Sequence, residues 1–268
     1  MRATATAVAR ARPAGGVVFP VLRSAPPLTL RPTGTARLSI AGSAAGPLGG
    51  DVLALDLRVE RHAQVEVTSI AAGMALPSPR PDGQPSPWSR MHVDVHVAAA
   101  AHLHWHTEPL IVCAAARHIT RTRVRLDAGA TLRWREVVVL GRAGEAPGSV
   151  RAELTADLGG SPLLRHELRL GPGERGWDGP AGTGGARVVG SELVVGPDAV
   201  LPAAAVDGAA RLPLEHGPAC LVTAVGTDVR TVTVLLDELA AAPPVATLRT
   251  RMPRAAAPAP RDRGPAPA

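Results

Sequence analysis

Residues 122–142 read TRVRLDAGATLRWREVVVLGR, and this stretch decides the fold. Apolar and charged side chains alternate on both sides of residues 127–130, and a period of two is typical of half-buried β-strands. The interruption contains Gly129, which can adopt the positive φ that a tight turn needs. The stretch therefore predicts a strand, a turn and a second strand that ends in the apolar run Val137–Leu140.

The same strand–turn–strand pattern occurs elsewhere in the chain. It occurs around residues 60–64 and around residues 98–101, and weaker copies open at Leu168 and Leu193. The units start at uneven intervals, which disfavours a propeller or a strict solenoid. We therefore expect an all-β fold of stacked hairpins, with insertions between the hairpins.

Length and composition indicate one large domain. The chain has 268 residues, of which 46% are hydrophobic but only 2% aromatic, so the core must consist mainly of Val, Leu and Ala. The formal charge is +6, and every basic residue apart from histidine is an arginine. Because no basic run is interleaved with aromatic residues, the charge is weak evidence for nucleic-acid binding, and we expect no nucleic-acid partner.

The domain boundaries follow from composition. Residues 1–15 are rich in Ala and Arg without a clear period, so we expect a frayed N-terminus. Residues 16–254 form a single β-rich domain in this interpretation. Within it, residues 231–242 carry leucine and valine at helical spacing and precede two prolines, which predicts a helix near the C-terminus. Residues 255–268 are an Ala/Pro tail that we expect to be disordered.

The two cysteines, Cys113 and Cys220, form neither a C-x-x-C motif nor a disulfide framework. This usage fits a reducing compartment, and two buried thiols are the simplest interpretation. The N-terminus has no continuous apolar segment of the signal-peptide kind, and no stretch of about 18 apolar residues occurs. We therefore expect a cytoplasmic protein without a membrane partner.

Motifs of catalysis are absent from the sequence. It contains neither a phosphate-binding loop of the Walker type nor a Gly-x-Ser-x-Gly nucleophile motif. These absences disfavour a nucleotide-binding enzyme and a hydrolase but leave other enzymes open, and we expect no tightly bound cofactor.

Three histidines, His102, His104 and His106, alternate with Leu103 and Trp105. On a strand they share one face, with successive side chains roughly 7 Å apart, which is loose for a single metal ion. One interpretation is that they are the outward polar positions of a half-buried strand. The other is transient contact with an ion such as nickel or zinc, which imidazole suits.

Carboxylates at or near predicted strand ends are the second set of candidates. They are Asp51, Asp56, Glu108 and Glu136. Most such residues are solvated or paired with arginine. Glu136 differs because it lies between Trp134 and an apolar run, where a charge can be partly buried. It is either a functional acid or half of a structural ion pair with an arginine, and the sequence leaves both open.

The order of these segments resembles the UreD family of urease accessory proteins, also called UreH. Four segments carry the resemblance: Gly46–Asp51 followed by Leu53–Asp56; Thr68–Ala72; Trp105–Ile111; and Glu136 with Leu140–Arg142 and Gly144–Glu145. The sequence departs from the family pattern at Ile70, where the family has Gln, and at Thr107, where it has Pro. The Pro-Arg-x-Trp near the family's C-terminus is reduced to Pro253–Ala255.

The resemblance implies an all-β fold of stacked, helicoid strands with one or two short helices near the C-terminus. It also implies a scaffold without catalysis that joins apo-urease to other accessory proteins, a helical partner and a GTPase, and lets nickel pass to the active site. Transient nickel contacts are then expected at Asp51, Asp56, His106, Glu108 and Glu136. The alternative is a β-rich module that binds protein or carbohydrate and has no connection with nickel.

Overall fold

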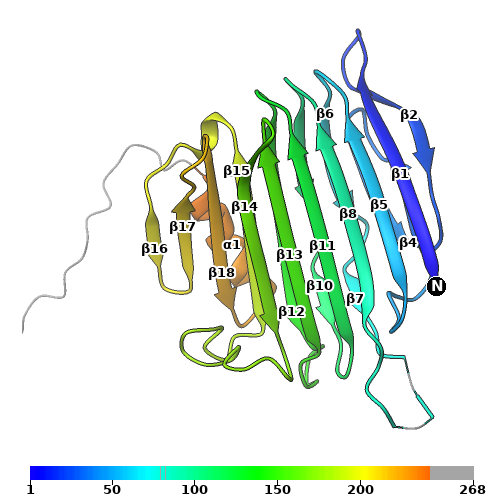
Figure 1. Ribbon diagram of the computed structural model, residues 1–268, viewed down its shortest axis with the longest axis vertical. Helices are drawn as coiled ribbons and strands as arrows, with labels where there is room; N and C mark the ends of the chain where they lie inside the picture. Colours follow the sequence, from blue (N-terminus) through cyan, green and yellow to red (C-terminus); the bar gives the residue numbers. More distant parts are fainter. Residues whose placement is uncertain (79, 82, 242–268) are drawn as a thin grey trace, which may run out of the picture.

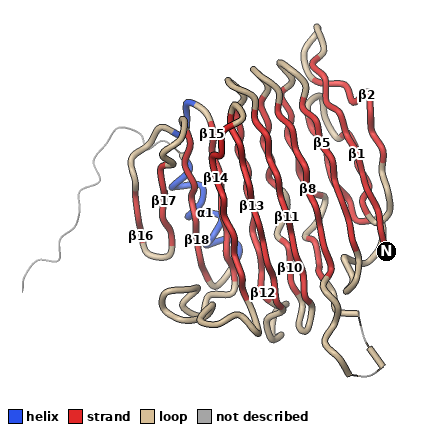
Figure 2. Tube along the Cα trace, in the orientation of Figure 1, coloured by secondary structure: helices blue, strands red, loops and turns tan. Residues whose placement is uncertain are grey.

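Two β-sheets pack against each other in this computed structural model, which describes residues 1–78, 80–81 and 83–241 (Figure 1). The first, called sheet 1, has seven strands in the order β14 (Ser161–Leu170), β13 (Ser149–Leu158), β11 (Arg117–Leu126), β8 (Ser89–Val97), β5 (Val52–Val59), β1 (Arg2–Ala11) and β2 (Val17–Arg23). Strand predominates throughout the described chain, as the red segments of Figure 2 show. The predicted all-β class is confirmed.

Sheet 2 has eleven strands, and nine of them form its main path. In order these are β16 (Ala204–Val206), β17 (Ala209–Pro213), β18 (Ala219–Gly226), β15 (Val188–Val195), β12 (Thr131–Leu140), β9 (His102–His106), β6 (Gln64–Ser69), β4 (Arg37–Gly42) and β3 (Leu28–Pro32). The short strands β7 (Gly73–Ala75) and β10 (Leu110–Val112) extend the sheet beside the end of β12. A 3₁₀ turn, η1, spans Pro197–Ala199 and follows β15.

The repeated units are arches, and our expectation of hairpins was wrong. In each unit the first strand lies in sheet 1 and the second in sheet 2: β5 and β6, β8 and β9, and β11 and β12. Successive units stack in parallel, so that β5 pairs with β8 and β8 with β11, while β6 pairs with β9 and β9 with β12. Each strand has one apolar face, and the arch places the two apolar faces of a unit against each other.

The turns of the three arches share one geometry. In each, a carbonyl oxygen accepts a hydrogen bond of 3.0 Å from the N–H three residues later: Glu60 to Ala63, Ala98 to Ala101, and Asp127 to Ala130. The third residue of each turn has a positive φ: 63° at His62, 57° at Ala100 and 79° at Gly129. The sequence pattern that defined the units therefore corresponds to a real structural repeat.

The main core lies between the sheets and consists mostly of Val, Leu and Ala, as the composition predicts. Trp105 of β9 and Trp134 of β12 face each other in register and stack, with ring centres 4.2 Å apart. Such pairs add to the free energy gained by burying their area. Both cysteines are buried, as expected.

The N-terminal segment is ordered strand, so our expectation of a frayed lead-in was wrong. Residues 2–9 of β1 pair in parallel with β5, and Ala5, Ala7 and Ala9 are fully buried against the core. The sequence did not reveal the strand's period of two, because its inward residues are alanines, which contrast little in hydrophobicity with the residues between them. The weaker copy expected at Leu168 was also wrong, because β14 ends at Leu170 and no strand follows in the described residues 171–187 before β15 begins at Val188. The Ala/Pro tail lies outside the described residues.

The predicted C-terminal helix is confirmed as α1 (Val229–Ala240). It begins at Asp228, whose carboxylate accepts a hydrogen bond of 2.9 Å from the N–H of Thr231. Val232 and Leu236 pack on the outer face of sheet 2, where Gly190 of β15 leaves room for them. No helix in the described part of the chain is long and apolar enough to cross a membrane.

Candidate functional site

The five predicted contact residues do not converge on one place. Across residues 1–78, 80–81 and 83–241, no group of three or more His, Cys, Asp or Glu side chains is arranged to hold a metal ion. Asp56, His106 and Glu136 lie on three different strands, whereas Asp51 and Glu108 lie just outside strands, so each is described by its own surroundings.

Asp51 is buried just before β5, and the chain itself uses both of its oxygens. Oδ1 accepts a hydrogen bond of 2.6 Å from the terminal amine of Met1, and Oδ2 accepts one of 2.9 Å from the N–H of Leu48. The ammonium offsets the carboxylate charge, and the second bond closes the turn that leads into β5. These contacts give Asp51 a structural role.

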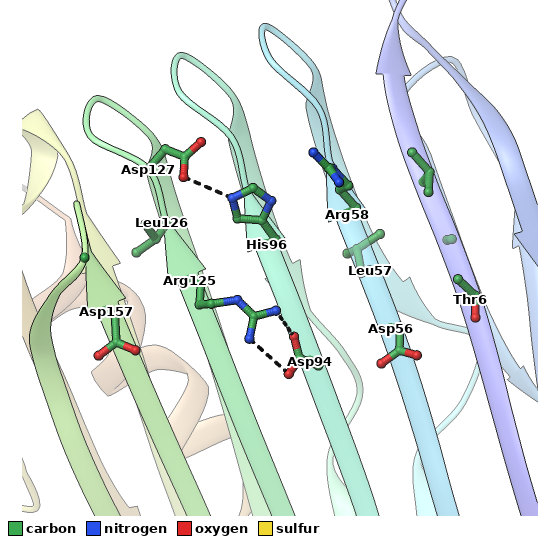
Figure 3. Close-up of a pocket in the computed structure, with 13 residues that line it drawn as sticks. Thr6, Asp56, Leu57, Arg58, Asp94, His96, Arg125, Leu126, Asp127 and Asp157 are labelled. Carbon is green, nitrogen blue, oxygen red and sulfur yellow. Dashed lines mark hydrogen bonds and ion pairs between the residues drawn. The ribbon is translucent and has the colours of Figure 1, made fainter.

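Asp56 lies on the outer face of sheet 1, facing away from the other sheet. Figure 3 shows it between Thr6 of β1 and Asp94 of β8, its neighbours in register. Asp94 is bound by Arg125, whereas no hydrogen bond or ion pair of Asp56 occurs among the described residues. The side chain lines a shallow pocket on this charged face.

His106 and Glu108 lie at and just beyond the end of β9, and both are exposed. The N–H of Glu108 donates a hydrogen bond of 2.9 Å to Ser69 Oγ on β6, which fixes its backbone. His104 lies two residues before His106 on the same outer face of sheet 2. Burial, followed by the charge of His106, lowers the pKa of His104.

Glu136 occupies the interior between the two sheets. Along β12, the side chains of Leu132, Trp134, Glu136, Val138 and Leu140 share one face, because successive residues alternate. Trp134 belongs to the main core, and Val138 belongs to a second apolar cluster nearer the other end of the sheets. Glu136 therefore lies at the boundary between two apolar regions.

The carboxylate of Glu136 is held only by neutral groups. Its Oε1 accepts a hydrogen bond of 2.9 Å from Trp134 Nε1 and another of 3.1 Å from Thr122 Oγ1. Thr122 belongs to β11 of sheet 1, so the second bond crosses between the sheets. Burial raises the pKa of Glu136, and the two hydrogen bonds oppose this rise. Among the described residues, none forms an ion pair with Glu136.

A layer of polar side chains continues from Glu136 across sheet 2. Ser191 of β15 is opposite Glu136 in the antiparallel register, and Thr223 of β18 is opposite Ser191. We call Thr122, Glu136, Ser191 and Thr223 the interior polar layer. Thr122 and Ser191 are buried, whereas Glu136 and Thr223 keep part of their surface accessible although they face the interior.

The structure excludes the ion pair that the sequence suggested for Glu136. Arg133 and Arg135 flank it in sequence but point to the opposite face of β12, where both bind Glu192 of β15. Glu192 is only 1% exposed, and Arg135 also pairs with Asp237 of α1. Sequence reasoning missed Glu192, although a lone acid within the apolar run Val188–Val195 was a signal for a buried ion pair.

The matched residues that follow β12 have a structural role in the turn at its end. Gly141 has a φ of 84°, and a Cβ at this position would lie 2.7 Å from the carbonyl oxygen of Ala146. Arg142 Nε donates a hydrogen bond of 2.8 Å to Glu145 Oε1, and this pairing lowers the pKa of Glu145 to about 2. Gly141, Arg142 and Glu145 therefore build the turn at the end of β12, close in sequence to Glu136.

The interior polar layer offers oxygen ligands but few of them. No hydrogen bond of the described residues uses Glu136 Oε2, and the hydroxyls of Thr122 and Ser191 lie on neighbouring positions. One carboxylate and neutral hydroxyls bind a divalent cation weakly, because tight sites use several charged or imidazole ligands. The layer suits an ion that binds briefly and leaves.

The sequence of this chain matches one protein family over most of its length. The family model described as UreD urease accessory protein matches residues 4–263. The chain is 43% identical to urease accessory protein UreD 3 of Streptomyces griseus, over 89% of this chain and 96% of that protein. It is also 43% identical to urease accessory protein UreD of Streptomyces coelicolor, over 88% of this chain and 94% of the relative. The chain therefore belongs to the UreD family of urease accessory proteins.

Proposed function

We propose that this chain is a non-catalytic scaffold that binds apo-urease and the other accessory proteins, a helical partner and a GTPase, in the cytoplasm. In this proposal nickel is the cargo, and it passes between the two sheets along the interior polar layer on its way to the urease active site. Family membership supports the assignment to urease maturation.

The observation that carries the nickel route is Glu136. A carboxylate that faces the protein interior without a cation is costly, and most proteins pair it with arginine or lysine. Here the two nearest arginines in sequence are bound to Glu192 on the other face of the sheet. Glu136 therefore presents a charge inside the protein, between two apolar clusters, that a passing cation can neutralise for a short time.

Glu136→Gln tests this proposal. Glutamine keeps an oxygen that can accept the hydrogen bonds from Trp134 and Thr122, but it removes the charge. We expect the variant to bind urease and the accessory partners as the wild type does and to lower urease activation, most strongly at limiting nickel. Pull-down of the complex and urease activity should be measured side by side in cells that coexpress all components across a nickel series.

Glu153→Gln is the matched control, because it replaces the same carboxylate by the same amide. Glu153 lies on the outer face of sheet 1, where it pairs with Arg121. The control should leave activation unchanged at every nickel level. Full activation by Glu136→Gln throughout the series would contradict the route past this residue. A parallel loss of complex formation and activation without nickel dependence would mean that Glu136 is only structural.

A further inference from the structure

The outer face of sheet 2 presents a pair of imidazoles that lies outside the interior polar layer. His104 and His106 of β9 face outward, opposite to Trp105, which stacks in the main core. His106 is exposed and His104 is half-buried, and a shallow groove lined by His104, Glu66 and Arg37 borders the pair. The two rings are therefore reachable from solvent.

The rings lie closer together than their positions on the strand require. Residues two apart on a strand are separated by roughly 7 Å, whereas the ring centres of His104 and His106 are 5.3 Å apart, with planes inclined at 58°. With metal–nitrogen bonds of about 2.0–2.1 Å, two imidazoles on one ion have their ring centres roughly 5 Å apart. The spacing of the two rings is therefore close to that of a chelate.

The third histidine of the row does not belong to the pair. His102 Nδ1 is 2.6 Å from Thr131 Oγ1, its neighbour on β12, and this hydrogen bond holds its ring. His102 shares the strand, the face and the partial burial of His104, so it provides a matched control inside the same row.

Charged neighbours make the position compatible with a cation. On one side, Glu66 of β6 is opposite His104 in register. Arg37 binds Oε2 of Glu66 at 2.8 Å, and no hydrogen bond of the described residues uses Oε1. On the other side, Arg133 and Arg135 are bound to Glu192, which reduces their repulsion of a metal ion.

We propose that His104 and His106 form a two-imidazole site for a divalent transition-metal ion on the outer face of sheet 2, beside the negative charge of Glu66. Water fills the remaining positions. The site deepens the proposed function if the ion is nickel, but its existence requires only the purified chain. It is separated from Glu136 by the sheet itself, because the histidines and Glu136 lie on opposite faces of adjacent strands.

The ligand set predicts which ions bind. Imidazole ligands suit nickel, copper and zinc, and affinities for such a site increase from Mn²⁺ through Co²⁺ and Ni²⁺ to Cu²⁺. Mg²⁺ prefers oxygen ligands and gives up its water reluctantly, so it should not compete. With two protein ligands, the site should bind and release its ion readily.

The test is a titration of the full-length chain, purified without a polyhistidine tag, with NiCl₂ by isothermal titration calorimetry. Losing a residue that only supports a metal ligand typically weakens metal affinity by roughly 10–100-fold. Because His104 and His106 are ligands themselves, we expect His104→Ala and His106→Ala each to weaken nickel affinity by at least that much. Because a chelate fails when either ligand is lost, the double variant should bind little more weakly than the single ones. A nickel titration in the presence of excess MgCl₂ should give the same nickel affinity, because Mg²⁺ should not occupy the site.

His102→Ala should bind nickel as the wild type does, and unfolding in urea checks that every variant is folded. Nickel affinity that is unchanged in both His104→Ala and His106→Ala would overturn the proposal, as would an equal loss in His102→Ala. The outcome is independent of the interior route: Glu136→Gln reports on activation, whereas this titration reports on binding at the outer face.

Discussion

Glu136 and Glu192 lie in adjacent strands of the same sheet, β12 and β15, yet they face opposite sides of it. Glu192 is fully buried beside α1, and Arg133 and Arg135 neutralise it. Glu136 faces the other sheet and meets only the indole of Trp134 and the hydroxyl of Thr122. The comparison shows that an acid on either face of this sheet can be held by arginines, as Glu192 is, or can lack a cationic partner among the described residues, as Glu136 does.

The difference has an energetic consequence. Removing one partner of a buried ion pair leaves the other charges uncompensated, whereas removing an isolated buried charge relieves a desolvation cost. Glu192 should therefore matter for stability and Glu136 for function. Substitutions at Glu192, Glu136 and Asp237 test this contrast, and the effect on the free energy of unfolding should decrease in that order.

Glu192→Ala should give the largest effect. The substitution leaves Arg135, whose side chain is 12% exposed, and Arg133, which is 33% exposed, without their shared carboxylate. Breaking a buried pair typically costs about 3–5 kcal/mol, and the partial exposure of Arg133 places the expected loss near about 3 kcal/mol. Urea unfolding followed by circular dichroism measures it. A loss as small as that of an exposed pair, such as in Glu153→Ala, would contradict the assignment.

Glu136→Gln should have the second-largest effect on stability, and this effect should depend on pH. Because burial raises the pKa of Glu136 above its ordinary value of 4.5, the folded protein binds a proton there more readily than the unfolded chain. The resulting stabilisation is fully present below the unfolded pKa and is lost as pH rises through the folded pKa. Glutamine cannot ionise, so the variant should not show this loss.

The measurement is the free energy of unfolding of both proteins at several pH values from about 4.5 upward. The stability of Glu136→Gln relative to the wild type should increase with pH, by about 1.4 kcal/mol for each unit by which folding raises the pKa. A difference that stays constant over this range would show that Glu136 is not desolvated as the structure indicates.

Asp237→Asn should have the smallest effect. Asp237 of α1 is 60% exposed and binds Arg135, which Glu192 already holds. Exposed ion pairs contribute about 0–1 kcal/mol and are screened by salt, so we expect a loss below about 0.5 kcal/mol that disappears at high ionic strength. Urea unfolding at low and high salt checks this. A larger loss that persists in salt would mean that α1 is held mainly through Asp237.

The sequence predicted local features well where their cause is local. Alternation around residues 127–130 predicted both strands of that unit and the turn between them, because a strand with one buried face must repeat every two residues. Gly129 was expected to allow the turn and does so with a φ of 79°. The helix at residues 229–240 followed from its apolar spacing and from the prolines after it.

The sequence identified candidate residues by their chemistry but did not predict which partners surround them. The sequence identified Glu136 as a partly buried acid, but it placed Arg133 and Arg135 beside it as possible partners. Alternation puts those arginines on the other face, and their partner Glu192 is almost 60 residues away in the chain. Likewise, the spacing of His104 and His106 appeared too loose for one ion, whereas their side-chain conformations bring the rings together.

The sequence by itself therefore determined which segments become strands, where the chain turns, and the family to which its motifs belong. Only the tertiary structure decided that each unit is an arch between two sheets, because alternation specifies which face is apolar but not which strand edge pairs with which. The same packing decided that Glu136 meets Thr122 of the opposite sheet. Contacts between distant segments depend on the register and stacking of whole sheets, which no single stretch of residues encodes.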